Sequence, residues 1–227
     1  MNVGGLIFPG IDQADFTGPF EILSRLPEAD FLVIGKDLSP VKDAKGLILT
    51  PTHDFTSAPD LDILLVPGGS GVNRLMEDDE TLDFIRAQVS AASITLSVCT
   101  GALILGAAGL LQGRRATTHW AAKQFLSDLG ALPQESRVVV DLPFVFAAGV
   151  TSGIDAALQV AALAAGEDVT RQIQLYIEYA PAPPFPGGTP ETSPASILEA
   201  VNTTLRPTVN ERAAIVSRLR QKLFPHD

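Results

Sequence analysis

The chain has 227 residues, and 46% of them are hydrophobic, so we expect one compact domain over residues 1–227 with a substantial buried core. Sixteen basic residues stand against 26 acidic ones, and the formal charge of −10 disfavours binding to nucleic acid or to an anionic membrane surface. The composition therefore favours a small neutral molecule or another protein as the partner.

Short apolar runs rich in β-branched residues predict strands, and the stretches between several of them have helical spacing. The predicted strands are 3–8, 31–34, 46–50, 63–66, 94–98 and 144–148. The predicted helices are 17–26, with Thr17 as its N-cap, 78–91, the small-residue stretch 100–108, 151–165 and 167–179. This alternation is typical of an α/β sandwich that has a mostly parallel central sheet and helices on both faces.

The proline-rich stretch 180–194 can form neither a helix nor a central strand. We interpret it as an extended strap, and a flexible linker is the alternative. A second globular domain would need at least roughly 50 residues, and fewer follow. Residues 195–227 instead carry one helical pattern, with Ile215 and Leu219 as its apolar positions.

Cys99 is the only cysteine, which excludes an internal disulfide and is typical of a protein in the reducing cytoplasm. Residues 1–9 have no basic region and too short an apolar run for a secretory signal, so export is not expected. The stretch 94–111 is uncharged over 18 residues, the length of a marginal membrane span. Because β-branched residues come first and alanine and leucine later, we predict a buried strand and a buried helix there instead.

Cys99 lies where the predicted strand 94–98 meets the predicted helix 100–108. A strand, a sharp turn and a helix form a nucleophile elbow, which holds a side chain clear of the sheet. The N-terminus of the following helix favours the thiolate, which is the reactive form of cysteine. The alternative is a buried structural cysteine.

Two further loops follow predicted strands, and ligands of open α/β sheets bind at the carboxyl ends of strands. Loop 9–19 contains Asp15, which either takes part in chemistry or only caps the next helix. Loop 67–71 has the sequence Pro-Gly-Gly-Ser-Gly, whose glycines let backbone N–H groups approach a ligand. This loop lacks the spacing of a P-loop or of a dinucleotide fingerprint, so we expect an anion or oxyanion pocket there rather than a phosphate site.

His119 could form a dyad with Cys99, or it could hydrogen-bond within the fold, and the sequence leaves both open. His53 and His226 have no metal-ligand spacing with His119, and no cysteine cluster exists. No metal site is therefore expected.

Taken together, several segments resemble the PfpI-like superfamily, relatives of the class I glutamine amidotransferase domain. The matching text comprises 8–9, 15–19, 66–71, 97–101, 115–120, 149–155 and 178–185. These segments extend over most of the chain, and the set is much more specific than any single one. The resemblance implies a flavodoxin-like three-layer sandwich that works as a homodimer.

Within the superfamily, the resemblance is to members that hydrate isocyanides, R–N≡C, to N-substituted formamides, with isocyanide and water as reactants and no cofactor. It implies that Cys99 attacks the terminal carbon while Asp15 protonates nitrogen, which gives a covalent thioimidate. The pKa of Asp15 should then be raised by burial or by the adjacent sulfur. Backbone N–H groups of Gly69 and Thr100 are the implied oxyanion or thiolate donors. The implied pocket residues are Gly68, Ser70, Val150, His119 and Trp120.

Departures from other superfamily members separate the alternatives. Peptidase-like members carry His directly after the nucleophile, where this chain has Thr100, and deglycase- or glyoxalase-like members carry Glu where it has Asp15. Residues 141–143 read Asp-Leu-Pro where an Asp-Gly-Asn turn is expected, which should change only a surface hairpin. The remaining alternatives are an enzyme acting on α-oxoaldehydes and a non-catalytic ligand-binding domain like the sensor half of AraC-like regulators. A regulator would need a helix-turn-helix module, and the chain ends at Asp227 without one.

Overall fold

The structure, a computed structural model, describes residues 1–225. Its centre is a six-stranded sheet with the order β2-β1-β5-β6-β10-β9. The strands are β1 (Asn2–Leu6), β2 (Asp30–Ile34), β5 (Ile63–Val66), β6 (Ile94–Val98), β9 (Val138–Asp141) and β10 (Phe144–Ala147). All neighbouring pairs are parallel except β9 and β10. The five parallel strands therefore follow the flavodoxin-like order, which confirms the predicted fold class.

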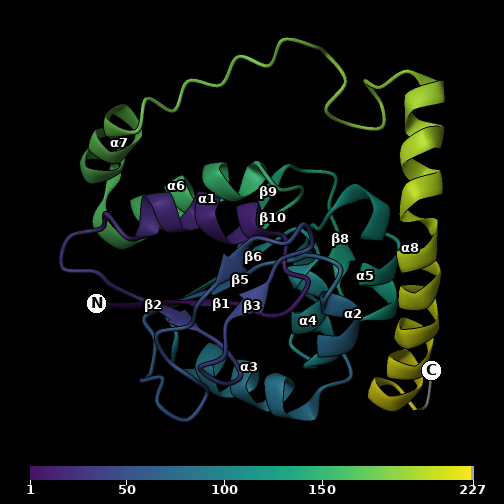
Figure 1. Cartoon of the computed structure of the whole chain (residues 1–227), viewed down its shortest axis with the longest axis horizontal. Helices are drawn as coiled ribbons and strands as arrows, with labels where there is room; N and C mark the ends of the chain where they lie inside the picture. The colour runs from purple at the N-terminus through teal and green to yellow at the C-terminus, as the bar shows by residue number, and fades with distance from the viewer. Residues whose placement is uncertain (226–227) are drawn as a thin grey trace.

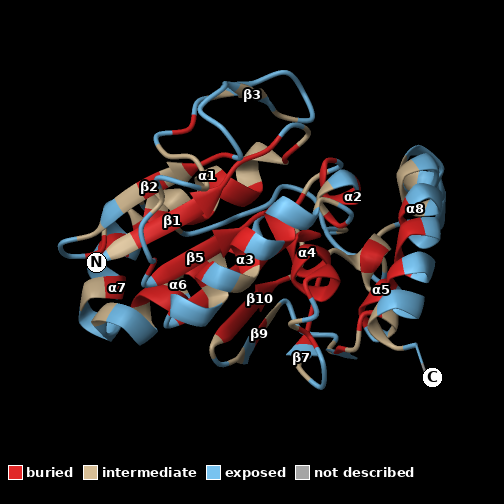
Figure 2. Cartoon of the chain, turned by 90° about the horizontal axis from the view of Figure 1, so that it is seen from below, coloured by how far each residue is buried: buried red, intermediate tan, exposed pale blue. Residues whose placement is uncertain are grey.

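Helices cover both faces of this sheet (Figure 1). One face carries α1 (Gln13–Leu23) and α6 (Ser152–Ala165), and α7 (Glu167–Tyr176) packs on α6. The other face carries α3 (Asp79–Ala91), α4 (Gly101–Ala107) and the short α2 (Val72–Leu75). Because both faces are covered, β5 and β6 are buried at every position (Figure 2).

The C-terminal part lies at one end of the layers. Residues 177–194 contain neither helix nor strand and arc from α7 across to α8 (Ala195–Leu223) (Figure 1). Helix α8 packs on α2, on α5 (Phe125–Asp128) and on the 3-10 helix η1 (Trp120–Ala122), with Ile215 and Leu219 buried as predicted. His226 and Asp227, the end of the predicted segment 195–227, lie outside the described residues.

The first helix begins earlier than predicted. Asp12, not Thr17, is the N-cap of α1, and its Oδ1 accepts a hydrogen bond from the Ala14 N–H at 3.2 Å. Asp12 therefore satisfies a free N–H of the first turn, while Thr17 and Pro19 lie inside the helix. As a result, Asp15 belongs to the first turn of α1 rather than to a loop.

The predicted strand 46–50 does not join the central sheet. Only β4 (Ile48–Leu49) is extended, and it pairs with β3 (Val41–Lys42) in a separate hairpin that projects from the sandwich (Figure 2). The Asp43 carboxylate closes this hairpin, because it accepts hydrogen bonds from the N–H groups of residues 45, 46 and 47. The apolar run was therefore wrongly assigned to the core.

Strand β9 was not predicted, although Val138, Val139 and Val140 are β-branched. It forms an antiparallel hairpin with β10, and residues 141–143 lie at the turn as expected. A small parallel pair, β7 (Arg115–Ala116) with β8 (Leu132–Pro133), was also missed.

The uncharged stretch 94–111 contains β6 and α4, as predicted. Within residues 1–225, no helix combines the length and the apolar character needed to cross a membrane.

Candidate active site

Three loops meet at the carboxyl ends of β1, β5 and β6. Backbone hydrogen bonds join the first two, because Asp12 N donates to Gly68 O at 2.9 Å and Gly71 N donates to Gly10 O at 3.0 Å. The third is the turn at Cys99, directly after β6. The loops that were predicted to carry chemistry therefore form one region.

Cys99 lies on the predicted sharp turn. Its φ of 55° is in the left-handed region, which non-glycine residues rarely adopt, and such strain is typical of functional sites. The Cys99 N–H donates to Ala147 O at 3.0 Å, and the Thr118 hydroxyl donates to Cys99 O at 2.6 Å. Hydrogen bonds on both sides of the residue thus hold it in this conformation.

Asp15 is fully buried and lies next to Cys99. Its Oδ2 accepts a hydrogen bond from the Gly68 N–H at 3.0 Å, while Oδ1 has no hydrogen-bond partner within the described part of the chain. Burial, together with the negative charge of Asp12, raises the pKa of Asp15 to about 7, although the Gly68 N–H and Cys99 act in the opposite direction. A carboxyl group with this pKa can hold a proton near neutral pH.

Burial also raises the pKa of the Cys99 thiol, and the charge of Asp15 raises it further. The Thr100 backbone N–H lowers it. Because two negative charges in this buried space repel each other, the pair retains one proton over a wide pH range. The proton can be on sulfur or on the carboxyl oxygen, and the second arrangement combines a nucleophile with an acid.

The close contact of these groups requires glycine at position 68. A Cβ there would lie 2.6 Å from Thr100 N and 2.9 Å from Asp15 Oδ2. The Gly69 N–H donates to Thr100 Oγ1 at 3.1 Å, so it is engaged by that hydroxyl. Of the two predicted backbone donors, the Thr100 N–H bonds to the Cys99 sulfur, whereas the Gly69 N–H bonds to the Thr100 hydroxyl and positions that residue.

A cavity of about 690 Å³ brings together three of the predicted pocket residues, His119, Trp120 and Val150. Thr118 also lines it, and its hydroxyl donates to Cys99 O, whereas Cys99 and Asp15 themselves do not belong to the lining of this cavity. Residues 188–191, in the proline-rich stretch, form part of its wall. Gly68 instead lies against Asp15, and Ser70 is exposed, with its hydroxyl donating to Gly10 O at 3.3 Å.

His119 has a structural contact. Its Nδ1 accepts a hydrogen bond from the Ala121 N–H at 3.3 Å and caps η1, and no hydrogen bond joins it to Cys99 within residues 1–225. Burial and the positive charge of Arg212 lower the pKa of His119. Of the two possibilities that the sequence left open, the structure favours hydrogen bonding within the fold.

Two groups that affect the site were not singled out from the sequence. Thr118 holds the Cys99 carbonyl, and Asp12 raises the pKa of both Asp15 and Cys99. Thr118 stands in the segment 115–120 and Asp12 in the loop 9–19, and both stretches were noted in the sequence. The sequence could not assign their roles, because neither a hydroxyl that bonds a backbone carbonyl nor a carboxylate that caps a helix has a distinctive residue spacing.

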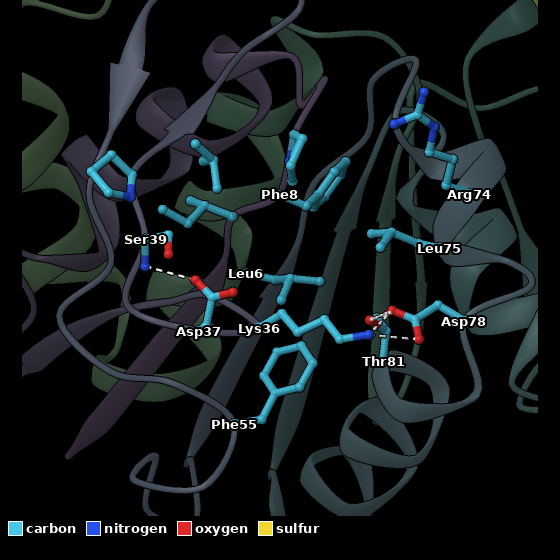
Figure 3. Close-up of a pocket in the computed structure, with 15 residues that line it drawn as sticks. Leu6, Phe8, Lys36, Asp37, Ser39, Phe55, Arg74, Leu75, Asp78 and Thr81 are labelled. Carbon is cyan, nitrogen blue, oxygen red and sulfur yellow. Dashed lines mark hydrogen bonds and ion pairs between the residues drawn. The ribbon is translucent and has the colours of Figure 1, made fainter.

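A second cavity, of about 290 Å³, lies near the carboxyl end of β1 (Figure 3). Leu6, Phe8, Phe55 and Leu75 make its wall mostly apolar. Lys36 crosses it and donates to both carboxylate oxygens of Asp78 at 2.8 and 2.9 Å (Figure 3). Cys99 and Asp15 do not belong to its lining. In the described residues, no group of three or more His, Cys, Asp or Glu side chains is placed to hold a metal ion.

The flavodoxin-like sheet, with a cysteine on a strained turn between a strand and a helix and beside a buried carboxyl group, defines an α/β protein that has the geometry of a nucleophile elbow. The chain belongs to the DJ-1/PfpI family, whose model matches residues 1–163. It is 47% identical over 223 residues to isonitrile hydratase of Pseudomonas putida, covering 98% of each chain.

Solved structures show the same fold. A THiJ/PfpI family protein from Pseudomonas syringae superimposes with a TM-score of 0.92 at 37% identity, over 95% of this chain and 90% of that one. DJ-1beta of Drosophila melanogaster superimposes with a TM-score of 0.73 at 20% identity, over 79% of this chain and 98% of that one, and this likeness concerns the fold alone.

Proposed function

We propose that the protein is an isonitrile hydratase, a hydro-lyase-type enzyme that adds water to an isocyanide and releases an N-substituted formamide. The observation that carries the proposal is the buried pair of Cys99, directly after β6, and Asp15, in the first turn of α1. The near full-length identity to the Pseudomonas putida isonitrile hydratase supports it independently.

In the first step, the Cys99 thiolate forms a bond to the terminal carbon of R–N≡C, one carbon–nitrogen π pair moves onto nitrogen, and the carbon keeps its lone pair. Asp15 then supplies the proton that neutralises the adduct. Atom balance places this proton on the former isocyanide carbon, giving the thioimidate R–N=CH–S–Cys99. The resemblance implied protonation on nitrogen, but nitrogen receives its proton only when water adds.

In the second step, the Asp15 carboxylate takes a proton from water as the oxygen adds to the thioimidate carbon, and it passes this proton to nitrogen. The tetrahedral adduct R–NH–CH(OH)–S–Cys99 collapses, the carbon–sulfur bond breaks, and R–NH–CHO leaves. The Asp15 carboxylate takes the proton of the hydroxyl group in this collapse, and Cys99 returns as thiolate. The Thr100 N–H, which lowers the pKa of Cys99, stabilises the leaving sulfur.

The cavity beside Thr118, His119, Trp120 and Val150 is the proposed space for the R group. Its 690 Å³ is within the range of small-molecule sites, and its wall includes both apolar and charged side chains. Ser70 faces Gly10 and Gly68 supports Asp15, so neither is assigned to the R-group pocket.

We also propose that the protein is a cytoplasmic homodimer. Large apolar side chains are exposed on α7, on the proline-rich stretch and on the first part of α8, namely Leu175, Tyr176, Phe185, Ile197 and Val201. A second subunit would cover such side chains. A nucleophilic thiol also needs the reduced state that the cytoplasm maintains.

The α-oxoaldehyde and ligand-sensor alternatives are less supported, because the identity to an isonitrile hydratase extends over nearly the whole chain, and because Asp15 stands where deglycase- or glyoxalase-like members carry Glu.

The test is to mix the reduced protein with a simple aryl isocyanide, follow formamide by absorbance, and measure intact mass in the same mixture. We expect turnover and a transient adduct of one substrate mass. In Cys99→Ala both should disappear, with at least about a 10⁴-fold loss of rate and an unchanged circular dichroism spectrum. Wild-type turnover by Cys99→Ala would exclude the mechanism, and no turnover by folded wild-type protein would exclude the function.

A further inference from the structure

Arg212, on α8, is a buried arginine close to the site. Its residue exposure is only 4%, although arginine is almost never this buried without an ionic partner. Within residues 1–225, no carboxylate oxygen lies within 4.0 Å of its guanidinium. The described residues thus leave a buried positive charge without an ion pair.

Asn73 holds this guanidinium in place. Arg212 Nε donates to Asn73 Oδ1 at 2.9 Å, and Asn73 is itself only 1% exposed. The Asn73 amide donates in turn to Glu211 Oε2 at 2.8 Å and to Thr208 O at 3.2 Å, both on α8. A neutral amide anchors Arg212, so the anchor fixes the position of the charge without cancelling it.

The elements around Arg212 lead directly to Cys99. Helix α2, which carries Asn73, follows the glycine loop that contacts Asp15 and Thr100. The 3-10 helix η1, which also packs on α8, follows Thr118, whose hydroxyl holds the Cys99 carbonyl. Arg212 therefore bonds to the helix that follows the glycine loop, and its own helix α8 also packs on the segment that follows Thr118.

The charges agree with this placement. The negative charge of Cys99 raises the pKa of Arg212, together with that of Glu211, while burial lowers it as the largest effect. A Coulomb interaction between two charges is mutual, so the guanidinium favours the ionised sulfur, while burial is the largest effect on the pKa of Cys99. The acidic groups that face Cys99, Asp15 and Asp12, act against ionisation, and His119 is the other titratable group that Arg212 affects.

We propose that Arg212 is a positioning residue that stabilises the Cys99 thiolate by its buried, unpaired positive charge, held in place by Asn73. This inference rests on Cys99 being the nucleophile of the proposed function. The charge of Arg212 opposes the effect of the Asp15 and Asp12 carboxylates, which disfavour the ionised sulfur.

The test is a pH titration of the thiolate by its ultraviolet absorbance, with Cys99→Ala as the blank, since Cys99 is the only cysteine. Arg212→Gln removes the charge but keeps a donor for Asn73, and Arg212→Lys keeps the charge. Arg218→Gln is the matched control, because Arg218 is on the same helix and donates to Glu77 at the surface.

We expect Arg212→Gln to raise the titration midpoint by about one pH unit, Arg212→Lys to raise it by less than half as much, and Arg218→Gln to leave it unchanged. A wild-type midpoint in Arg212→Gln would overturn the proposal. Equal shifts in the glutamine and lysine variants would also overturn it, since the effect would then not depend on charge.

If Arg212→Gln does not fold, Asn73→Ser releases the guanidinium without changing the net charge. We then expect a raised midpoint, and an unchanged one overturns the proposal. The titration needs no isocyanide. Absence of hydration in the wild type would therefore refute the proposed function, whereas only the titration can refute the role of Arg212.

Discussion

Two polar regions border the glycine loop 67–71, and they use carboxyl groups in opposite ways. In the cavity of Figure 3, burial alone would raise the pKa of Asp78, but hydrogen bonds from Lys36 and Thr81 outweigh it, and the pKa is lowered. At the other region, Asp15 forms no ion pair within residues 1–225, and its pKa rises to about 7. A paired carboxylate contributes to structure, whereas an unpaired buried carboxyl group keeps a proton that can be used in catalysis.

Replacing the catalytic carboxyl group should produce the largest change. Asp15→Asn keeps the shape and can still accept from the Gly68 N–H, but it has no acidic proton to donate. We expect kcat/KM for isocyanide hydration to fall by about 10²–10⁴-fold. A loss smaller than tenfold in a protein with wild-type thermal stability would contradict the role of Asp15.

The pH dependence tests whether Asp15 and Cys99 act as a pair. Below pH 7 both groups are protonated, and the reactive form appears when the pair loses one proton. We therefore expect kcat/KM to rise about tenfold per pH unit up to about pH 7 and then to level off. A rate that falls as pH rises through 7 would instead mean that Cys99 is already ionised and Asp15 donates independently.

Gly68, which lies against Asp15 and Thr100, should tolerate no side chain. Gly68→Ala places a methyl group 2.6 Å from Thr100 N, so the backbone must shift away from Asp15. We expect a loss of about 1–3 kcal/mol in unfolding free energy and about a 10²-fold loss of kcat/KM.

Gly113→Ala is the matched control for Gly68→Ala. Position 113 also has a positive φ of 69°, but a Cβ there meets nothing within 4 Å. It should lower stability, measured by denaturant unfolding, by about 1 kcal/mol without changing kcat/KM. Equal losses of activity in both variants would contradict a local effect at position 68.

Asp15 should also make the free energy of unfolding decrease as the pH rises. Its folded pKa of about 7 exceeds the ordinary value of 3.8, so the folded state holds the proton more tightly between these pH values. The unfolding free energy should therefore fall between about pH 4 and pH 7, by at most about 4 kcal/mol. Asp15→Asn should remove this slope in denaturant titrations, and an unchanged slope would assign it to other groups.

Substitutions at the ion-paired cavity of Figure 3 should have the smallest effect on stability and activity. Lys36→Met removes the ion pairs to Asp78 and Glu80, which are partly exposed. We expect a change in unfolding free energy below about 1 kcal/mol and an unchanged kcat/KM. A tenfold loss of activity would show that the cavity of Figure 3 takes part in the reaction, and that the paired Asp78 does not have a structural role alone.

Much of the fold was predictable because buried parallel strands are short, continuous apolar runs. The runs at 63–66 and 94–98 became β5 and β6 with the predicted bounds. The run 46–50 is equally apolar, but it lies in an exposed hairpin closed by Asp43, and local hydrophobicity cannot distinguish the two cases. The start of α1 was misplaced because Asp12 and Thr17 are both good N-caps.

By itself, the sequence determined the parallel α/β sheet, the cysteine on its elbow and the acidic and glycine loops beside it, because these depend on local patterns of residues. Only the tertiary structure decided that Asp15 is buried with no ion pair among the described residues and has a raised pKa, that His119 caps a 3-10 helix, and that Arg212, late in the chain, is buried against Asn73 beside the glycine loop. These properties depend on distances and on exclusion of water, which arise when segments far apart in the sequence pack together.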